Sequence, residues 1–565
     1  MIIVRATKFI LFFILIQIGS IFGQDLVLPD YISNGLYLNA QVGADTNANG
    51  TRKDTNRVYV LKRGGFYLSN SHIDNNGYTL RIRAEYGPGE KPVIWLTQNT
   101  TSSAYPGRFI YVDHNVKISN LLVSGVVEGD TAAMSHMPGG LLQTISAGWD
   151  IEIDSCILTN ASGNHVRTDQ ACRVIKVTNT IFGNMGYLGT SNLGAGKAFD
   201  IRNVSCDTLL VQNCSFINSQ DRIVRHLTSL ATINHFIFDH NTIVNSMAYD
   251  GILSLGWVGA ETRVTNNLII DPFAAGNDTD KTRQAEFITN EKDPFGGNRM
   301  AWIFTDTSAG HSATTTYNVS NNYYAISDSG NAFYARYTGT PTGFPSMFSL
   351  PPEGSPLTWY INQKVADSTK TFTKDNNIVL TKVPKLMTAM MDWYRSPAGG
   401  NKTKNTPTSK WSPLTNDYDR KTYQYYADTL NCTYSTSRPA YTGSLGGFPV
   451  GDLNWYPDKK AAWITWVTDV NDKNNNSPVS FTLNQNYPNP FNPSTKITFS
   501  LKNSGLTTLL VYNVLGEKVA TLINGNLKAG AHELSFNASK FSSGIYIYRL
   551  ESNGSSQVRK MVLLK

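Results

Sequence analysis

The chain has 565 residues, which is enough for several domains or for one long repetitive domain with accessory parts. Its formal charge of +7 is the sum of +2 in the first 24 residues, +6 in residues 481–565 and −1 in residues 467–480, while residues 25–466 carry equal numbers of acidic and basic side chains. A neutral body lacks the positive surface of a nucleic-acid-binding protein. The five cysteines have no CxxC spacing, which excludes a zinc ribbon and a disulfide-rich scaffold.

The first 24 residues have the pattern of a secretory signal peptide. Arg5 and Lys8 form a short basic region, an apolar stretch follows from Phe9 to Ile18, and Gly23 supplies a small residue at the end. The apolar stretch is shorter than the ~20 residues that span a bilayer, so a signal peptide is favoured over a membrane anchor. We therefore expect an exported protein.

A loose repeat runs through residues 116–325. Each copy is an alternating strand, a polar turn residue and a second short apolar strand, as in IEIDSCILTN, IKVTNTIFGN, LLVQNCSFIN and FIFDHNTIVN. The tighter spacings between successive copies are 24 to 34 residues, which suits one coil of a parallel β-helix with loops of varying length. The recurring turn asparagines are expected to form a ladder in which each amide bonds the next coil: Asn179, Asn213, Asn266 and Asn321.

Four of the cysteines test this alignment of coils. Cys172 and Cys206 occupy equivalent positions on adjacent coils, where strands lie about 4.8 Å apart, so we expect a disulfide or a close thiol contact. Cys156 and Cys214 share another column but lie two coils apart, and no bond between them is expected.

Segments 56–70 and 80–96 look like the first coils, and from about residue 345 to 466 the repeat is lost and loops or a cap are expected. Taken together, these repeats resemble the right-handed parallel β-helix proteins of the pectate-lyase-like superfamily. The resemblance implies an all-β fold for residues 25–466, with long strands stacked coil on coil.

A further strand precedes the first strand of each repeat, and two of these further strands, KAFDIR and DRIVRHL, are rich in charge. Since side chains alternate along a strand, Asp200 and Arg202 are expected on the outer surface. Aligning Ile201 with Val224 places Arg225 beside Arg202, and the arginine of HVRTDQ falls near the same column. The expected result is a basic column flanked by carboxylates.

Stacked like charges repel unless an anion or a carboxylate lies between them. An acidic polysaccharide along the helix would offer one carboxylate per sugar to such arginines. A lyase must neutralise that carboxylate, remove the C5 proton and protonate the leaving oxygen, and bound calcium can supply the first of these. The candidate residues are, as catalytic groups, Lys197, Arg202, Arg225 and His226; as substrate-binding groups, Arg167 and Arg222; and as calcium ligands, Asp200, Asp221 and Asp250.

The same charges have a second interpretation, as ion pairs that lace an exposed sheet and contribute little each. The segment FIFDHNT resembles a segment of pectate lyases, but the RxPxxR segment that carries their catalytic arginine is absent. The acidic motif set of inverting polygalacturonases is absent as well. His240 takes the position of the turn asparagines, so we expect a turn residue there and not a catalyst.

One further segment has the start of a calcium-loop pattern. DTNANG, beginning at Asp45, matches D-x-N-x-N-G, but Lys53 and Asn56 stand at the later positions where a calcium loop supplies ligands. An Asn-Gly turn is the favoured interpretation.

The C-terminal region changes character after an Asn-rich linker at 467–480. Residues 481–565 show short alternating strands separated by Gly, Asn and Pro, which predicts a small β-sandwich. The run Tyr487-Pro488-Asn489-Pro490, the run Gly544-Ile545-Tyr546 and the basic-apolar end resemble the C-terminal sorting domain of type IX secretion cargo. The Trp-Asp pair common in that family is Phe536-Asn537 here. The resemblance implies contact with the type IX machinery, export across a Gram-negative outer membrane, and release or surface attachment.

Three functions remain open on the sequence alone. The first is a secreted or cell-surface lyase that acts by β-elimination on an acidic, pectin-like polysaccharide. The second is a non-catalytic surface protein that binds glycan or forms an adhesive rod. The third is a glycoside hydrolase of the same fold. Complete internal pairing of the charged residues would favour the second.

Overall fold

The computed structural model describes residues 25–127, 136–186, 195–226, 231–246, 252–272, 315–335, 370–386, 430–474, 481–501, 504–514, 516–528, 530–553 and 555–565. The chain divides into two compact units, Met1–Lys460 and Ala461–Lys565, which are described separately. The predicted signal peptide lies outside the described residues. Within the described ranges, no helix has both the length and the apolar character needed to cross a membrane.

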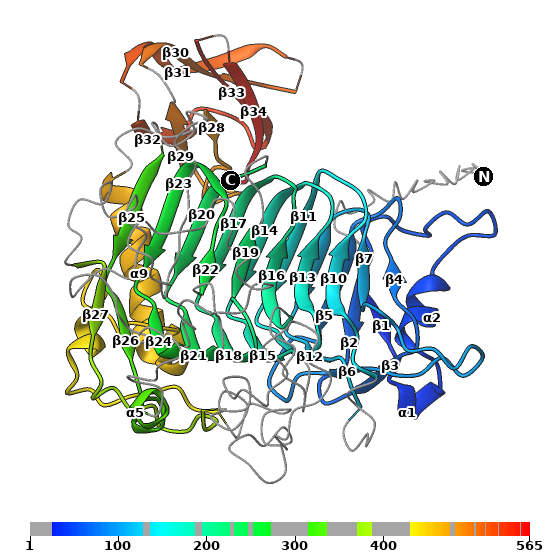
Figure 1. Ribbon diagram of the computed structural model, residues 1–565. Helices are drawn as coiled ribbons and strands as arrows, with labels where there is room; N and C mark the ends of the chain where they lie inside the picture. Colours follow the sequence, from blue (N-terminus) through cyan, green and yellow to red (C-terminus); the bar gives the residue numbers. More distant parts are fainter. Residues whose placement is uncertain are drawn as a thin grey trace, which may run out of the picture. The chain divides into compact units, whose positions relative to one another are not determined.

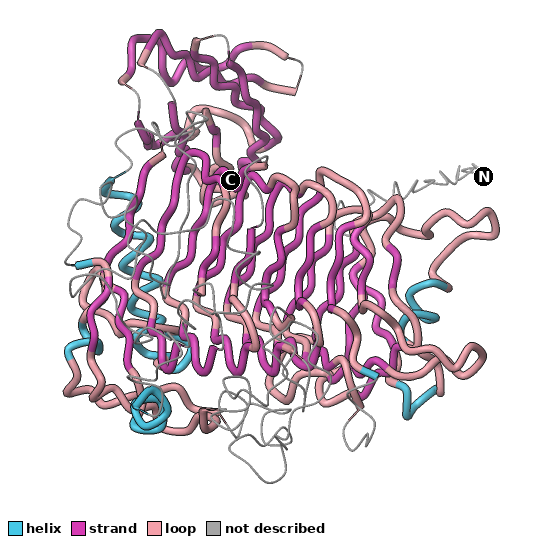
Figure 2. Tube along the Cα trace, in the orientation of Figure 1, coloured by secondary structure: helices cyan, strands magenta, loops and turns pink. Residues whose placement is uncertain are grey.

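The first unit is a right-handed parallel β-helix, as predicted, and each coil passes through three parallel sheets in turn (Figures 1 and 2). Sheet 1 contains β1 (Asp25–Leu28), β2 (Val58–Leu61), β5 (Leu80–Ala84), β8 (Val116–Ser119), β11 (Trp149–Asp154), β14 (Cys172–Thr178), β17 (Cys206–Gln212), β20 (Thr232–Asp239), β23 (Trp257–Thr265) and β25 (Thr316–Ser320). Sheet 2 contains β3 (Phe66–Ser69), β6 (Val93–Leu96), β9 (Leu122–Ser124), β12 (Ile157–Ala161), β15 (Ile181–Met185), β18 (Ser215–Ser219), β21 (Thr242–Ser246), β24 (Leu268–Pro272), β26 (Asn322–Ala325) and β27 (Phe372–Lys374). Sheet 3 contains β4 (Ile73–Asp74), β7 (Ile110–Val112), β10 (Gly140–Thr144), β13 (Asn164–Thr168), β16 (Lys197–Ile201), β19 (Val224–His226) and β22 (Leu253–Ser254).

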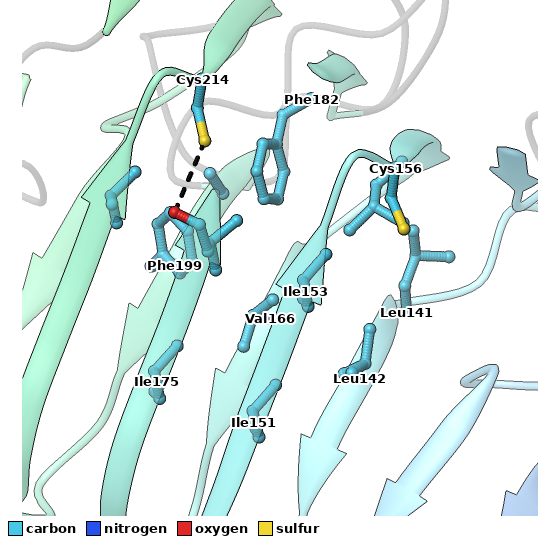
Figure 3. Close-up of a cluster of buried hydrophobic side chains, with 14 of the residues drawn as sticks. Leu141, Leu142, Ile151, Ile153, Cys156, Val166, Ile175, Phe182, Phe199 and Cys214 are labelled. Carbon is cyan, nitrogen blue, oxygen red and sulfur yellow. Dashed lines mark hydrogen bonds between the residues drawn. The ribbon is translucent and has the colours of Figure 1, made fainter. Parts of the chain in front are cut away.

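A continuous apolar core fills the interior between the three sheets. Aromatic rings from successive coils stack inside it: Phe182 and Phe216 lie 5.0 Å apart, and Phe216 and Phe238 lie 5.8 Å apart. Figure 3 shows how Phe182 and Phe199 lie among the aliphatic side chains of neighbouring strands. No single coil encloses such a core, so each coil depends on its neighbours for burial.

The register of the cysteines is confirmed. Cys172 and Cys206 lie directly opposite each other on β14 and β17, and their buried thiols are free. Cys156 and Cys214 are also free, as expected, and the thiol of Cys214 points toward the Val177 carbonyl at 3.7 Å (Figure 3). Burial raises the pKa of the Cys172 thiol to about 12.

The corner between sheets 1 and 2 uses one residue in the left-handed region on each coil, as at Asn179 (φ 54°) and Asn266 (φ 60°). The expected ladder through these asparagines is wrong, because their amides donate to Asp154 and Asp239 instead of to one another. His240 has the same conformation (φ 50°), which confirms its reading as a turn residue.

The amide ladder lies one residue later along the chain. The Asn241 amide donates to Asn267 at 3.1 Å, and the Asn267 amide donates to Asn322 at 2.8 Å. These three side chains are buried, and their amides also satisfy backbone carbonyls of the preceding coil. At the corner, therefore, the first of two adjacent polar residues adopts the left-handed conformation of the turn, and the second forms the ladder of side-chain hydrogen bonds.

A second ladder, which the sequence analysis missed, runs along sheet 2. Asn184 donates to Asn160 at 3.2 Å, Asn218 to Asn184 at 3.4 Å and Asn245 to Asn218 at 3.0 Å. All four residues are buried and have positive φ. They end the second strand of each repeat, where the quoted copies ILTN, IFGN, SFIN and TIVN carry the signal.

Two short helices lie at the start of the β-helix: α1 (Tyr31–Asn34) and α2 (Leu38–Gly43). Leu38 and Val42 of α2 are fully buried in the core, so α2 covers its first coils. Further along the chain come α5 (Asp328–Ala335), the 3₁₀ helices η5 (Pro439–Thr442) and η6 (Leu453–Trp455), and α9 (Pro457–Asn474).

The outer face of sheet 2 is covered by the chain that follows β27, at 375–386, and by segment 430–456. Their apolar side chains form a second buried cluster with outward residues of the sheet, among them Ile217 and Leu268. With β27, these are the described parts of the predicted cap from residue 345 onward, and the rest of that cap lies outside the described residues. The predicted end of the body at 466 falls inside α9, so part of the predicted linker is helical.

The second unit is the predicted small antiparallel β-sandwich. Its first sheet contains β28 (Thr482–Leu483), β29 (Ser494–Leu501) and β32 (Gly530–Asn537), and its second contains β31 (Lys518–Leu527), β30 (Gly505–Tyr512), β33 (Gly544–Ser552) and β34 (Ser555–Leu563). The two sheets enclose a core that includes Ile497, Leu509 and Tyr548.

Candidate functional site

The predicted site residues gather on the outer face of sheet 3, but their register differs from the prediction. Phe199 lies opposite Val224, so Asp200, and not Arg202, lies opposite Arg225. Arg167 lies opposite Asp200 on the other side. The expected all-basic column is therefore wrong. Along this column the charges alternate, with a carboxylate between two arginines.

Asp200 and Arg225 form a two-point ion pair between neighbouring coils. Arg225 Nε lies 2.6 Å from Asp200 Oδ1, and Arg225 Nη2 lies 2.8 Å from Oδ2. Arg202 Nη1 lies 3.7 Å from the same carboxylate. Burial alone would raise the pKa of Asp200, but the charges of Arg225 and its neighbours keep that pKa below its usual value. Both partners of the pair are buried, while 37% of the Arg202 side chain is exposed.

A second buried ion pair lies where the chain enters sheet 3. Lys197 Nζ lies 2.5 Å from Asp221 Oδ2, and Arg222 Nε lies 3.5 Å from Asp221 Oδ1. Arg222 also donates to Ser254 at 3.0 Å. Lys197 and Asp221 are 1% and 0% exposed. Burial lowers the pKa of the Lys197 ammonium to about 8, with the positive charge of Arg225 acting in the same direction.

His226 belongs to the inner side of sheet 3 and not to the charged face. It lies opposite Ile201, in the register of an inward-pointing residue, and it is 1% exposed. Burial lowers its pKa to about 4, so it is neutral at physiological pH. Its placement beside the other catalytic candidates was wrong because side chains alternate along β19, so the residue after the outward-facing Arg225 faces the core in either register.

Arg167, a predicted substrate-binding residue, belongs to a second group of polar residues on this face, and the other members of that group were missed in the sequence. Arg167 Nε pairs with both oxygens of Asp169, at 3.0 and 2.9 Å, and Asp169 accepts a hydrogen bond from Gln143 at 2.6 Å. Gln143 Oε1 in turn accepts from Arg108 Nε at 2.7 Å. Tyr111 lies opposite Gln143 in the outward column, and all five side chains are partly exposed. The signal was present in GRFIYVDH, GGLLQTIS and HVRTDQ, whose polar residues take the same column.

The structure gives little support to the expected calcium ligands. Asp200 and Asp221 both face cationic side chains, whereas calcium needs six to eight oxygens around it, so these two carboxylates do not fit a calcium site as they stand. Asp250 lies outside the described residues. No group of three or more His, Cys, Asp or Glu residues suited to a metal occurs in the part of the chain that the structure describes.

The segment that begins at Asp45 is a turn, as favoured. Asp45 pairs with Arg57 at 2.9 Å, and the backbone N–H of Asn47 donates to the Thr51 carbonyl at 2.7 Å. Gly50 has a positive φ of 81°, which a glycine adopts without strain. The polar residues of this segment therefore stabilise a turn through hydrogen bonds and an ion pair within the protein.

Comparison with known proteins gives one match. Residues 485–564 match the secretion system C-terminal sorting domain, and this range covers most of the second unit. No curated protein and no solved structure matches the chain. The predicted type IX sorting domain is therefore confirmed, and it implies contact with the secretion machinery and secretion or attachment to the cell surface.

Proposed function

We propose that this protein is exported to the outer surface of a Gram-negative bacterium, where its β-helix binds an acidic polysaccharide along the outer face of sheet 3. The sorting domain supports the location. For the binding function the supporting observation is that, among the described residues, cationic side chains outnumber carboxylates on one face.

Six cationic side chains gather between β7 and β19, and only three carboxylates pair with them among the described residues. The cations are Arg108, Arg167, Lys197, Arg202, Arg222 and Arg225, and the carboxylates are Asp169, Asp200 and Asp221. Excess charge of one sign attracts a polymer of the other sign, and guanidinium groups bind carboxylates at two points. The partly exposed row of Tyr111, Gln143 and Arg167 offers a linear contact surface, one residue per coil.

Burial favours binding over catalysis for this face. A general base must come within about 2.6–3.2 Å of the proton that it removes. Lys197 and His226 are 1% exposed, and Arg225 is 8% exposed and already paired with Asp200. Of the four catalytic candidates, Arg202 alone presents a large exposed fraction. The buried pairs are better suited to holding the partly exposed row in place.

The test is a binding titration of the mature full chain against neutral, carboxylated and sulfated oligosaccharides at two salt concentrations. We expect binding to the acidic oligosaccharides that weakens as salt rises, because screening reduces the attraction. Arg167→Gln should weaken binding. The matched control is Arg173→Gln, which removes an exposed arginine of sheet 1 that is paired with Asp150. Equal binding of neutral and acidic oligosaccharides, or no binding at all, would refute the proposal.

A lyase acting on the same acidic glycan is the second candidate, and one observation favours it. Burial lowers the pKa of the Lys197 ammonium, so Lys197 releases its proton more readily than an exposed lysine does, although the carboxylate of Asp221 at 2.5 Å acts in the opposite direction. The ultraviolet absorbance of an unsaturated uronate product would reveal this activity. The lyase proposal then requires that Lys197→Met abolishes product formation while glycan binding persists.

A further inference from the structure

We propose that Arg108 forms an oxyanion-binding site on sheet 3 that recognises the carboxylate or sulfate group of the bound glycan. This inference rests on the proposed binding function and names the residue that makes it selective. Arg108 precedes β7, and its side chain reaches across to β10. It was not among the residues singled out from the sequence.

The guanidinium of Arg108 lies over two glycines that leave room for it. A Cβ atom on Gly139 would lie 2.5 Å from Arg108 Nη1, and a Cβ atom on Gly140 would lie 3.1 Å from Nε. Nη1 also donates to the Gly107 carbonyl at 2.6 Å. Glycine at both positions therefore lets the guanidinium lie close against the backbone of the neighbouring coil, where a larger residue would force Arg108 to move.

The hydrogen-bond partners of Arg108 do not neutralise it. They are a side-chain amide and a backbone carbonyl, and no carboxylate among the described residues lies within ion-pair distance. Gln143 links Arg108 to Asp169, but Asp169 already pairs with Arg167. Burial and the charge of Arg167 both lower the pKa of Arg108, so this guanidinium is held where a positive charge is unfavourable without an anion.

The arrangement fits an oxyanion with two or more oxygens. A guanidinium presents five N–H donors in a planar fork, and the two bonds observed leave donors at Nη2 for a ligand. The carboxylate of a uronic acid and the sulfate ester of a sulfated sugar share this chemistry. Tyr111, in the next outward position along β7, would lie beside the sugar ring.

The experiment compares wild type, Arg108→Gln and Arg108→Lys in the mature full chain, with Arg173→Gln as control. Titrations use a galacturonate oligosaccharide, the same oligosaccharide after carboxyl reduction, and a sulfated oligosaccharide. Loss of a charge-assisted hydrogen-bond pair should weaken acidic binding by about 10- to 100-fold in Arg108→Gln. Arg108→Lys keeps the charge but loses the fork, so an intermediate loss is expected. The carboxyl-reduced oligosaccharide should not distinguish the variants, and the preferred acidic group identifies the source of the oxyanion.

A second measurement separates this inference from the proposed function. Sulfate and glucuronate, at constant ionic strength, should raise the thermal midpoint of wild type but not that of Arg108→Gln. If wild type binds no glycan yet shows this shift, the oxyanion site stands and the glycan function falls. If glycan binds and Arg108→Gln matches wild type, the glycan function stands and the Arg108 assignment is overturned. Absence of both effects overturns both.

Discussion

Arg225 and Asp200 join neighbouring coils of the β-helix through two parallel hydrogen bonds on a face where the pair is almost fully buried. Both charges have been removed from water, and their mutual attraction offsets the free-energy cost of that desolvation. The loss of one leaves the other desolvated and without its main partner, which is far more costly than the loss of an exposed pair.

The first prediction follows from that asymmetry. Arg225→Met should lower the free energy of unfolding of the β-helix by about 3–5 kcal/mol, because among the described residues Asp200 would then keep only the longer 3.7 Å ion pair with Arg202 and the more remote charge of Lys197. Adding Asp200→Leu to this variant should restore part of the loss, since the buried charge is then gone. Urea unfolding measures both. The exposed pair Arg173–Asp150 is the control, and Arg173→Met should cost less than about 1 kcal/mol. Equal costs for the two single variants would show that burial of the Arg225 pair is energetically unimportant.

Calcium should not stabilise the β-helix through Asp200 and Asp221. The oxygens of Asp200 and Asp221 face Arg225, Lys197 and Arg222, so a calcium ion would have to displace cations already bound there. Thermal unfolding with calcium and with chelator should give the same midpoint. A midpoint that rises with calcium in wild type, and does not rise in Asp200→Asn, would restore the calcium site expected from the sequence.

A single substitution in the amide ladder of Asn241, Asn267 and Asn322 should lower the free energy of unfolding. Asn267 donates to Asn322 and to the Phe238 carbonyl, and it accepts from Asn241, all in the core. Asn267→Ala leaves several buried polar groups without partners, at about 1–3 kcal/mol each, so a loss of at least about 2 kcal/mol is expected in urea unfolding. The matched control is Asn203→Ala at an exposed position, and this substitution should change the free energy of unfolding by less than about 0.5 kcal/mol. Similar small losses at both positions would argue against a stabilising ladder.

The fold could be predicted from the sequence because its signal repeats on every coil. An error in one copy is corrected by the next, as the confirmed register of Cys172 and Cys206 shows. The ladder was displaced by one residue because asparagine stands at two adjacent positions, as at Asn266 and Asn267, and period alone does not say which one turns the chain. Backbone conformation separates them, since Asn266 alone of the two has positive φ.

The site was harder to predict because it depends on pairing between coils whose loops differ in length. A shift of two residues keeps the inward and outward alternation of β19 but changes every neighbour, so Arg225 meets Asp200 instead of Arg202. Burial also depends on distant chain segments. Ser215, for example, is covered by Asp452, more than two hundred residues later in the sequence. No local pattern reports such a contact.

That contact gives the last prediction, which concerns pH. Asp452 is 2% exposed and accepts hydrogen bonds from Ser215 Oγ at 2.7 Å and from the backbone N–H of Asn454 at 2.9 Å. Burial raises its pKa to about 6, although these hydrogen bonds and the charge of Lys460 oppose the rise. A carboxyl whose pKa is higher in the folded than in the unfolded chain binds protons more tightly when folded. Its contribution to stability therefore grows as pH falls from about 6 to about 4, by up to about 3 kcal/mol.

Asp239 is a second buried carboxyl, and its pKa is shifted in the other direction. Burial alone would raise this pKa, but the charge of His240 and the hydrogen bonds to Asp239 lower it to about 2. Asp239 therefore reduces stability on acidification only at lower pH than Asp452 acts. Urea unfolding at pH 7 and pH 4.5 should thus show a smaller gain on acidification in Asp452→Asn than in wild type. An identical gain in both proteins would mean that Asp452 does not titrate in this range, and that its carboxylate is stabilised as well in the folded protein as in water.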